Sequence, residues 1–298
     1  ELRQEFDSMR DIAKVRYTSD TTDEFYQKEN AFFDEQSPIY EGLISDYYKA
    51  LLASSFQEEL KKEYGILVFD LAQMAIKTHD HKITEQLQKE NRLSTEYMKL
   101  LASAQIEFEG KERTLAEMTP FQKDVNRAIR KRASKVKWEF MQENHGKLDS
   151  IYDELVKTRT QIAHQLGYDN FVSLGYDRMS RSGYGPKEVA TFRELIQKNL
   201  VPLATKLRKE QADRLGVDSL KYYDEPLFFK DGNAKPQGDP AWIIAQGQKM
   251  YGSLSSETDE FYRFMREKDL MDLEVRKGKA GGGYCTYISK YASPYIFA

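Results

Sequence analysis

Apolar residues recur at helical spacing along most of the chain. After Ser37-Pro38, a pair typical of an N-cap followed by proline at the first helical position, one apolar face continues every four residues through Ile39, Leu43, Tyr47 and Leu51. The same periodicity predicts helices over 67–78 and 83–109, with Gly110 available as a terminator. The first third of the chain is therefore expected to be helical.

Further helices follow, each with a start or stop signal. Thr119-Pro120 predicts a helix to about Gly146, and the next apolar series is closed by Gly167. Asp169 predicts the start of a short helix over 170–179, and Gly185-Pro186 predicts the start of one over 187–200, with a kink at Pro202. Asp239-Pro240 predicts the start of another helix, and Ser255-Ser256 with Asp259 resembles a capping box at the start of the next. Residues 222–240, rich in Pro, Gly and Asn, predict an ordered loop. A composition break near Gly146 suggests domains 1–146 and 147–298.

The pattern changes near the end of the sequence. Residues 272–298 contain three consecutive glycines and then a segment rich in Tyr, Ile and Phe, which predicts extended structure. The expected fold class is therefore mainly α, with a small β-sheet near residue 298. A strand with an exposed edge beside flexible glycines can bind a peptide by strand addition. A plain hairpin whose glycines only make the turn explains the same residues equally well.

Composition excludes several function classes. The 298 residues are 40% apolar and 31% charged, and 45 basic against 48 acidic side chains give a net charge of -3. That balance argues against nucleic acid as the main partner, and a basic cluster between Arg127 and Lys137 is expected to be a solvated helix face. No apolar run approaches the length of a membrane span, and the charged N-terminus lacks the apolar run of a secretory signal. With a single cysteine, the chain is expected to be soluble and cytoplasmic.

Candidate catalytic groups are few. His79 and His81 are two positions apart, so on a helix they point to different sides and cannot both bind one metal. In a turn they could, but no third ligand is evident. His145 and His164 lie at predicted helix ends, and no His-Glu-x-x-His pattern occurs. Cys285 would need a base to become a nucleophile, and no histidine is placed to suggest one. The residues therefore predict neither a catalytic nor a metal-ligating set within this chain.

Four segments, in this order, resemble the oligoendopeptidase F family: residues 164–203, 232–240, 250–265 and 272–298. The family comprises cytoplasmic zinc metallopeptidases related to thimet oligopeptidase. The resemblance implies a multi-helical oligopeptidase fold and a zinc-dependent endopeptidase that hydrolyses short peptides in a deep channel between helical halves. It also implies that residues 147–298 form the first half of the catalytic domain.

This sequence departs from the family pattern in one respect. In the family, the aromatic strand leads into a helix carrying His-Glu-x-x-His, and a later glutamate completes the zinc site. The zinc ligands and the catalytic glutamate are therefore expected downstream of Ala298. What the resemblance assigns to this chain is substrate binding, with a mobile loop at Gly281, Gly282, Gly283 and Tyr284 and an approach to the active-site strand from Tyr295 to Ala298.

Two other function classes stay open at this point. The first is a non-catalytic helical scaffold or peptide-binding protein, which the same helices and aromatic strand could form. The second, less favoured, is a cysteine hydrolase that uses Cys285 as its nucleophile.

Overall fold

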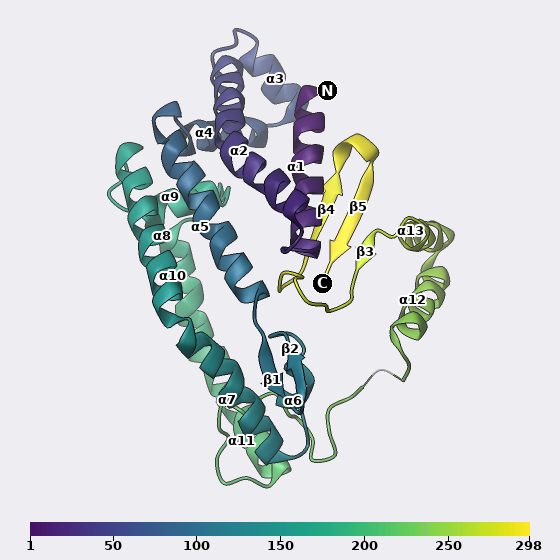
Figure 1. The fold of residues 1–298 in the computed structure, drawn as a ribbon. Helices are drawn as coiled ribbons and strands as arrows, with labels where there is room; N and C mark the ends of the chain where they lie inside the picture. Colours follow the sequence, from purple (N-terminus) through teal and green to yellow (C-terminus); the bar gives the residue numbers. More distant parts are fainter. Residues whose placement is uncertain (236) are drawn as a thin grey trace. The chain divides into compact units, whose positions relative to one another are not determined.

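The computed structural model describes residues 1–235 and 237–298, and most of them are helical (Figure 1). The prediction of a mainly α chain with a small sheet near residue 298 is confirmed. Two compact units alternate along the sequence: the first comprises 1–30, 98–143 and 210–298, and the second comprises 31–97 and 144–209. The division at Gly146 stays a prediction, and residue 146 lies within α8 (His145–Gln165). No described helix is long and apolar enough to cross a bilayer.

The second unit is built from helices alone in its described part. Its elements, some of which continue into the first unit, are α2 (Glu24–Leu52), α3 (Gln57–Tyr64), α4 (Leu67–Thr78), η1 (His81–Ile83), α5 (Thr84–Ala102), α8 (His145–Gln165), α9 (Phe171–Arg178), α10 (Pro186–Leu195), η2 (Ile196–Leu200) and α11 (Val201–Leu215). One buried cluster joins η1, α5, α8 and α9 through Ile83, Leu87, Ile162, Ala163 and Leu174.

The first unit combines helices with two small sheets. Its elements are α1 (Leu2–Ser19), β1 (Ile106–Phe108), β2 (Lys111–Arg113), α6 (Thr119–Gln122), α7 (Arg127–Glu143), α12 (Pro240–Leu254), α13 (Ser256–Glu267), β3 (Met271–Asp272), β4 (Tyr284–Ile288), η3 (Ser289–Tyr291) and β5 (Ser293–Phe297). A buried cluster of Ile106, Phe108, Met118 and Ala133 packs the β1–β2 hairpin on α7.

Pro38 lies inside α2, so the predicted helix start at Ser37-Pro38 is wrong. Proline has no N–H, which leaves the carbonyl of Asp34 without its helical partner. Asn91 on α5 donates its Nδ2 to that carbonyl at 2.9 Å, and Gln88 donates to the next carbonyl, of Glu35, at 2.8 Å. Side chains of a neighbouring helix thus replace the missing hydrogen bond, and α2 continues through the proline.

Gly110 belongs to a hairpin and does not end a helix. The predicted helix over 83–109 stops at Ala102, and β1 and β2 follow. Ile106 and Phe108 are buried while Glu107 between them is exposed, the alternation of a strand. Glu109 and Gly110 both have positive φ, at 52° and 71°, as the tight turn of a two-residue hairpin requires.

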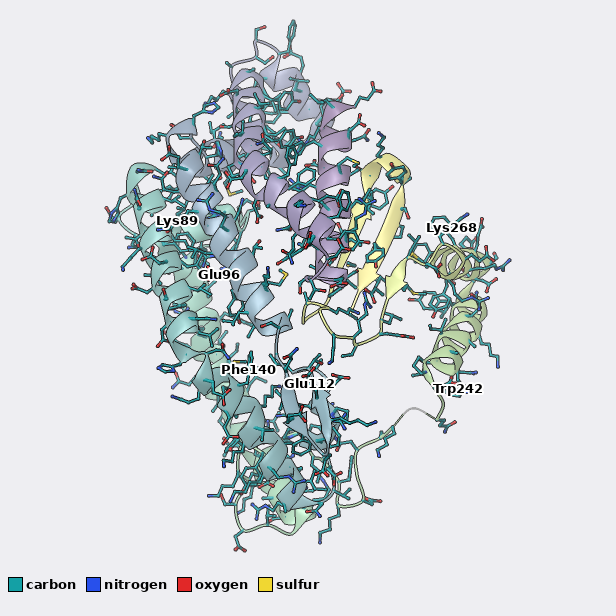
Figure 2. The ribbon with its side chains drawn as sticks, viewed as in Figure 1. Lys89, Glu96, Glu112, Phe140, Trp242 and Lys268 are labelled. Atoms are coloured by element: carbon teal, nitrogen blue, oxygen red, sulfur yellow. The ribbon has the colours of Figure 1, made fainter. Side chains whose placement is uncertain are left out.

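The other helix signals are largely confirmed. Asp239 accepts from the backbone N–H of Trp242 at 2.8 Å at the start of α12, where Figure 2 labels Trp242. Ser255 caps α13, although its partner in the capping box is Thr258 and not Asp259. The cap of α9 is Asn170, one residue after the predicted Asp169. The predicted helix from Thr119 to Gly146 is interrupted between α6 and α7.

A buried ion cluster fixes the loop that follows α11. Asp224 is fully buried and accepts from Arg127 Nη2 at 2.7 Å and from Arg130 Nη2 at 2.8 Å. Burial raises the pKa of the Asp224 carboxyl, but the hydrogen bonds from the two guanidinium groups lower it to about 2. The expectation of a solvated basic face on α7 is therefore wrong for Arg130, which is 2% exposed.

We predict that Asp224→Asn lowers the free energy of unfolding by about 3–5 kcal/mol, because it leaves buried arginine charge without a counterion. The pKa of Asp224 is depressed in the folded state, so its contribution is present above the unfolded pKa of about 4 and is lost as the pH falls toward 2. Urea unfolding at pH 7 and at pH 3 measures both effects. Asp213→Asn, an exposed position on α11, is the control. A loss of stability equal to that of the control would contradict the prediction.

Candidate functional site

The aromatic segment near residue 298 is a hairpin within a mixed sheet. The strand order is β3-β5-β4, with β4 antiparallel and β3 parallel to the central β5. Tyr295 therefore lies on the central strand, where it faces Thr286 of β4. Among the described strands, β4 pairs with β5 alone and forms one edge of the sheet. The predicted exposed edge thus corresponds to β4.

Helix α1 packs against one face of this hairpin (Figure 1). Tyr284 and Thr286 turn toward α1: the Tyr284 hydroxyl shares a 2.7 Å hydrogen bond with the Thr18 hydroxyl, and Thr286 donates to Asp11 at 3.3 Å. The Tyr284 ring also stacks on Phe297, with ring centroids 4.9 Å apart. Strand alternation places Cys285 and Tyr287 on the opposite face, where both are exposed.

Residues 276–280, called the capping segment below, complete the C-terminal end of α1. The last carbonyls of a helix have no partner within it. The backbone N–H of Ala280 donates to the Thr18 carbonyl at 2.8 Å, and Arg276 donates to the Ser19 carbonyl at 2.9 Å. In return, the N–H and the hydroxyl of Thr21 both donate to the Gly278 carbonyl at 2.7 Å. The cationic Arg276 also suits the negative end of the helix dipole.

Lys279 joins the capping segment to the sheet. Its side chain is 5% exposed, and its ammonium group donates to Asp272 Oδ1 at 3.0 Å, to the Glu274 carbonyl at 2.9 Å and to the Ala298 carbonyl at 2.7 Å. Arg276 binds both carboxylate oxygens of Asp272 at 2.7 Å. Burial raises the pKa of Asp272, but hydrogen bonds from Arg276, Lys279 and Ser19 outweigh it and hold that pKa well below its usual range.

The three glycines directly follow this fixed segment. Gly282 has φ of +96°, a conformation that disfavours any residue with a Cβ. A Cβ at Gly281 or Gly282 would meet no atom within 4 Å, whereas one at Gly283 would lie 3.2 Å from the carbonyl oxygen of Phe297. We call Gly281–Gly283 the glycine loop. Its tip is open and its last residue is packed closely on β5.

The structure places the predicted site residues at two kinds of position. Gly281, Gly282 and Gly283 form the open loop, while Tyr284 and Tyr295 turn toward α1, where burial raises the pKa of both hydroxyls. Ala298 donates its N–H to the Asp272 carbonyl at 3.0 Å. A substrate-binding role for these residues stays a prediction. The bonds of Thr18 to Tyr284 and of Ser19 to Asp272 were not predicted, because they join residues far apart in the sequence. The bonds of Lys279 were not predicted either, because they lie in an irregular segment that has no periodic pattern.

The described residues do not fit a zinc site. No group of three or more His, Cys, Asp or Glu side chains among them could hold a metal ion. His79 is bonded to the Pro38 carbonyl at 2.9 Å, His81 to Asp46 at 3.2 Å, and His164 to the Asp169 carbonyl at 3.1 Å. All four histidines belong to the second unit, whereas Cys285 belongs to the first.

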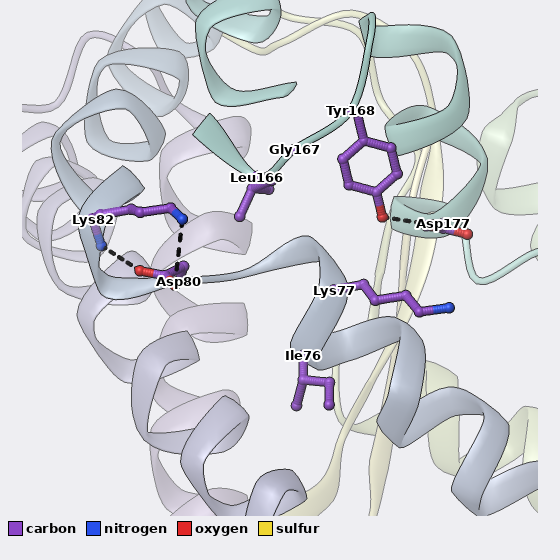
Figure 3. A pocket seen from close by; sticks show the side chains of 8 residues that line it. All are labelled: Ile76, Lys77, Asp80, Lys82, Leu166, Gly167, Tyr168 and Asp177. Carbon is purple, nitrogen blue, oxygen red and sulfur yellow. Dashed lines mark hydrogen bonds and ion pairs between the residues drawn. The ribbon is translucent and has the colours of Figure 1, made fainter. Parts of the chain in front are cut away.

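A pocket of about 410 Å³ in the second unit lies between α4, η1 and the α8–α9 connection (Figure 3). On one side Tyr168 donates to Asp177 at 2.6 Å, and on another Lys82 pairs with Asp80. Burial and then the hydrogen bond to Asp177 raise the pKa of Tyr168. None of the predicted site residues lines this pocket.

Two family models match the chain. The Peptidase M3 N-terminal domain matches residues 1–79, and Peptidase family M3 matches residues 121–235. Among curated proteins, none matches. The multi-helical fold and these matches define a member of a peptidase family.

Solved structures are similar over nearly the whole chain. PZ peptidase A, solved with an inhibitor, is 52% identical with a TM-score of 0.98, and the match covers 99% of this chain and 53% of that one. A Bacillus anthracis protein assigned to oligoendopeptidase F is 49% identical with a TM-score of 0.97, covering 99% of this chain and 54% of that one. A Chlamydophila abortus peptidase structure, 14% identical with a TM-score of 0.52, shares the fold alone.

The chain belongs to peptidase family M3 and, within it, to the oligoendopeptidase F group. It spans about half the length of the solved structures that it matches.

We predict that Asp272→Asn destabilises the first unit by about 3–5 kcal/mol, because Lys279 and Arg276 then lose their shared counterion. The folded-state pKa of Asp272 is lowered, so its contribution exists above the unfolded pKa of about 4 and disappears as the pH falls through the depressed value. Chemical unfolding across pH 2–7 measures it, with the exposed Asp149→Asn as control. If the free energy of unfolding of Asp272→Asn varied with pH in parallel with that of the wild type, Asp272 would not be the counterion of Lys279 and Arg276.

Proposed function

We propose that this chain supplies the peptide-binding part of a zinc-dependent endopeptidase that hydrolyses short peptides. The observation that carries the proposal is its 49–52% identity, over 99% of the chain, to PZ peptidase A and oligoendopeptidase F structures. Zinc, which the family resemblance implies, would be bound by residues outside 1–298. We also propose a cytoplasmic location, as the family resemblance implies.

The peptide would bind at the free edge of β4. An edge strand has backbone N–H and C=O groups that no neighbouring strand uses, and an extended peptide can pair with them. Supporting this, β4 pairs only with β5 among the described strands, and the open glycine loop directly precedes it. Main-chain pairing recognises peptides of many sequences, because it depends little on their side chains.

The residues of this chain would then bind and orient the substrate. The β4 edge would align the peptide backbone, and the glycine loop would close over it. Asp272 is bound by Lys279 and Arg276, and Asp11 accepts a hydrogen bond from Thr286. We therefore assign them to structure and give no residue of this chain an acid–base role.

The function is tested by activity and metal content together. The complete protein is expected to hydrolyse short fluorogenic peptides, to lose that activity on chelation, and to keep it after alkylation of Cys285. Residues 1–298 alone are expected to retain no stoichiometric zinc after dialysis. Inactivation by alkylation would favour the cysteine hydrolase, peptide binding without cleavage would favour the non-catalytic protein, and stoichiometric zinc on residues 1–298 would overturn the placement of the metal.

Alanine substitutions in the glycine loop test peptide binding at that loop. In the complete protein, Gly282→Ala strains a positive-φ position and Gly283→Ala crowds the Phe297 carbonyl, so each should raise KM or lower kcat. A strain of about 1–2 kcal/mol corresponds to about a 5- to 30-fold effect on kcat/KM.

Gly146→Ala on α8 is the control, because Gly146 lies outside the glycine loop, has no positive φ, and would place its Cβ in open space. Zinc content should be unchanged in all three variants. Unaltered kinetics in Gly282→Ala and Gly283→Ala, with zinc fully retained, would remove the glycine loop from the site.

A further inference from the structure

A single residue of α1 contacts the chain on both sides of the glycine loop. The carbonyl of Thr18 accepts the N–H of Ala280 at 2.8 Å, and its hydroxyl shares a hydrogen bond with the Tyr284 hydroxyl at 2.7 Å. Ala280 directly precedes the glycine loop and Tyr284 directly follows it. Both ends of the loop are therefore fixed to one point, at the end of a helix far away in the sequence.

The orientation of Thr18 is itself constrained. Its side chain is buried, and its hydroxyl lies 2.9 Å from the Lys14 carbonyl and 3.1 Å from the Val15 carbonyl of the same helix. A hydroxyl has one proton and two acceptor lone pairs, so it can donate to the helix and accept from Tyr284 at once. This arrangement fixes the Thr18 side chain before any ligand binds.

Tyr284 is equally constrained on its side of the hydrogen bond. Its ring stacks on Phe297 at an interplanar angle of 14°, and the ammonium group of Lys14 lies 5.1 Å from the ring centroid. The preceding residue, Gly283, packs closely on the Phe297 carbonyl. The end of the glycine loop at Tyr284 is therefore held by α1 and by β5 together.

The tip between these anchors has no comparable restraint. A Cβ at Gly281 or Gly282 would meet nothing within 4 Å, and glycine has the largest conformational freedom of any residue. Ordering such a segment on binding costs conformational entropy, and anchoring its ends in advance reduces that cost. Fixed ends also limit how far three residues can reach.

We infer that Thr18 is a positioning residue for peptide binding, holding the two ends of the glycine loop so that its tip closes over a short peptide on β4. The inference rests on the proposed function and adds to it a residue of the N-terminal helix. Thr18 acts through Tyr284 and Ala280 and does not contact the reacting atoms.

Substitution of Thr18 in the complete protein tests this role. Thr18→Val removes the hydroxyl and keeps the branched shape, so the bond to Tyr284 is lost while the carbonyl still accepts from Ala280. We expect KM for a fluorogenic short peptide to rise about 3- to 10-fold, the size of one lost hydrogen bond, with kcat changed less than about twofold. Thr18→Ser restores the hydroxyl and should restore KM.

Ser8→Ala is the matched control on the same helix. Ser8 is 1% exposed, and its hydroxyl accepts from the Lys290 N–H at 2.9 Å at the other end of the hairpin. The Ser8→Ala substitution therefore removes a buried hydroxyl between α1 and the hairpin but makes no change at the glycine loop. The KM of this variant should equal that of the wild type. Amide hydrogen exchange over residues 280–284 should accelerate in Thr18→Val and not in Ser8→Ala.

Several results would overturn the inference. These are an unchanged KM in Thr18→Val, equal rises of KM in Thr18→Val and Ser8→Ala, or no rescue by Thr18→Ser. Should Thr18→Val fail to fold, Tyr284→Phe removes the same hydrogen bond without a cavity and must raise KM by a similar factor. An unchanged KM in Tyr284→Phe would refute the positioning role.

The proposed function and the positioning role fail in different ways. A wild-type protein that cleaves no peptide would refute the proposed function. A wild-type protein that cleaves peptide, with equal KM values for Thr18→Val and Ser8→Ala, would refute the positioning role alone.

Discussion

The structure of the candidate site depends on the capping of α1 by residues 276–280. A helix ends with carbonyl groups that need partners, and here the partners come from a segment more than 250 positions away in the sequence. Ala280 donates to the Thr18 carbonyl, and Arg276 donates to the Ser19 carbonyl. In return, Thr21 donates to the Gly278 carbonyl. Because the glycine loop begins at the next residue, the same hydrogen bonds that end α1 also determine where that loop starts. The packing of α1 on β4 then determines where the loop ends.

Buried charge fixes the segments around this cap. Asp272 is bound by Lys279, Arg276 and Ser19, and through Lys279 it is connected to the carbonyl of Ala298. Asp224 has the same role for the loop after α11, where Arg127 and Arg130 bind it. In each cluster two cations surround one carboxylate, so the carboxylate remains ionised and its loss would leave like charges together. Irregular segments of the chain thereby acquire fixed positions without regular secondary structure.

The sequence predicted the helical class, the small sheet near residue 298 and the family, because periodicity, caps and the glycine–aromatic segment are local signals. Asp239 and Ser255 show this, since each caps the helix that follows it. Pro38 was misassigned because its lost hydrogen bond is replaced by Asn91, a contact that no local pattern contains. Gly110 was misassigned because a left-handed glycine serves a helix end and a hairpin turn equally well. The structural roles of Thr18 and Lys279 could not be identified from the sequence, because their hydrogen-bond partners come close to them only when the chain folds.

Peptide binding at the β4 edge, under the glycine loop, can be measured as protection of the backbone amides. Amide hydrogen exchange of the complete protein would be measured with and without a non-hydrolysable short peptide. We expect slower exchange over the glycine loop and β4, residues 281–288, and unchanged exchange in the β1–β2 hairpin, which belongs to the same unit. Bound peptide with no added protection over residues 281–288 would contradict this expectation.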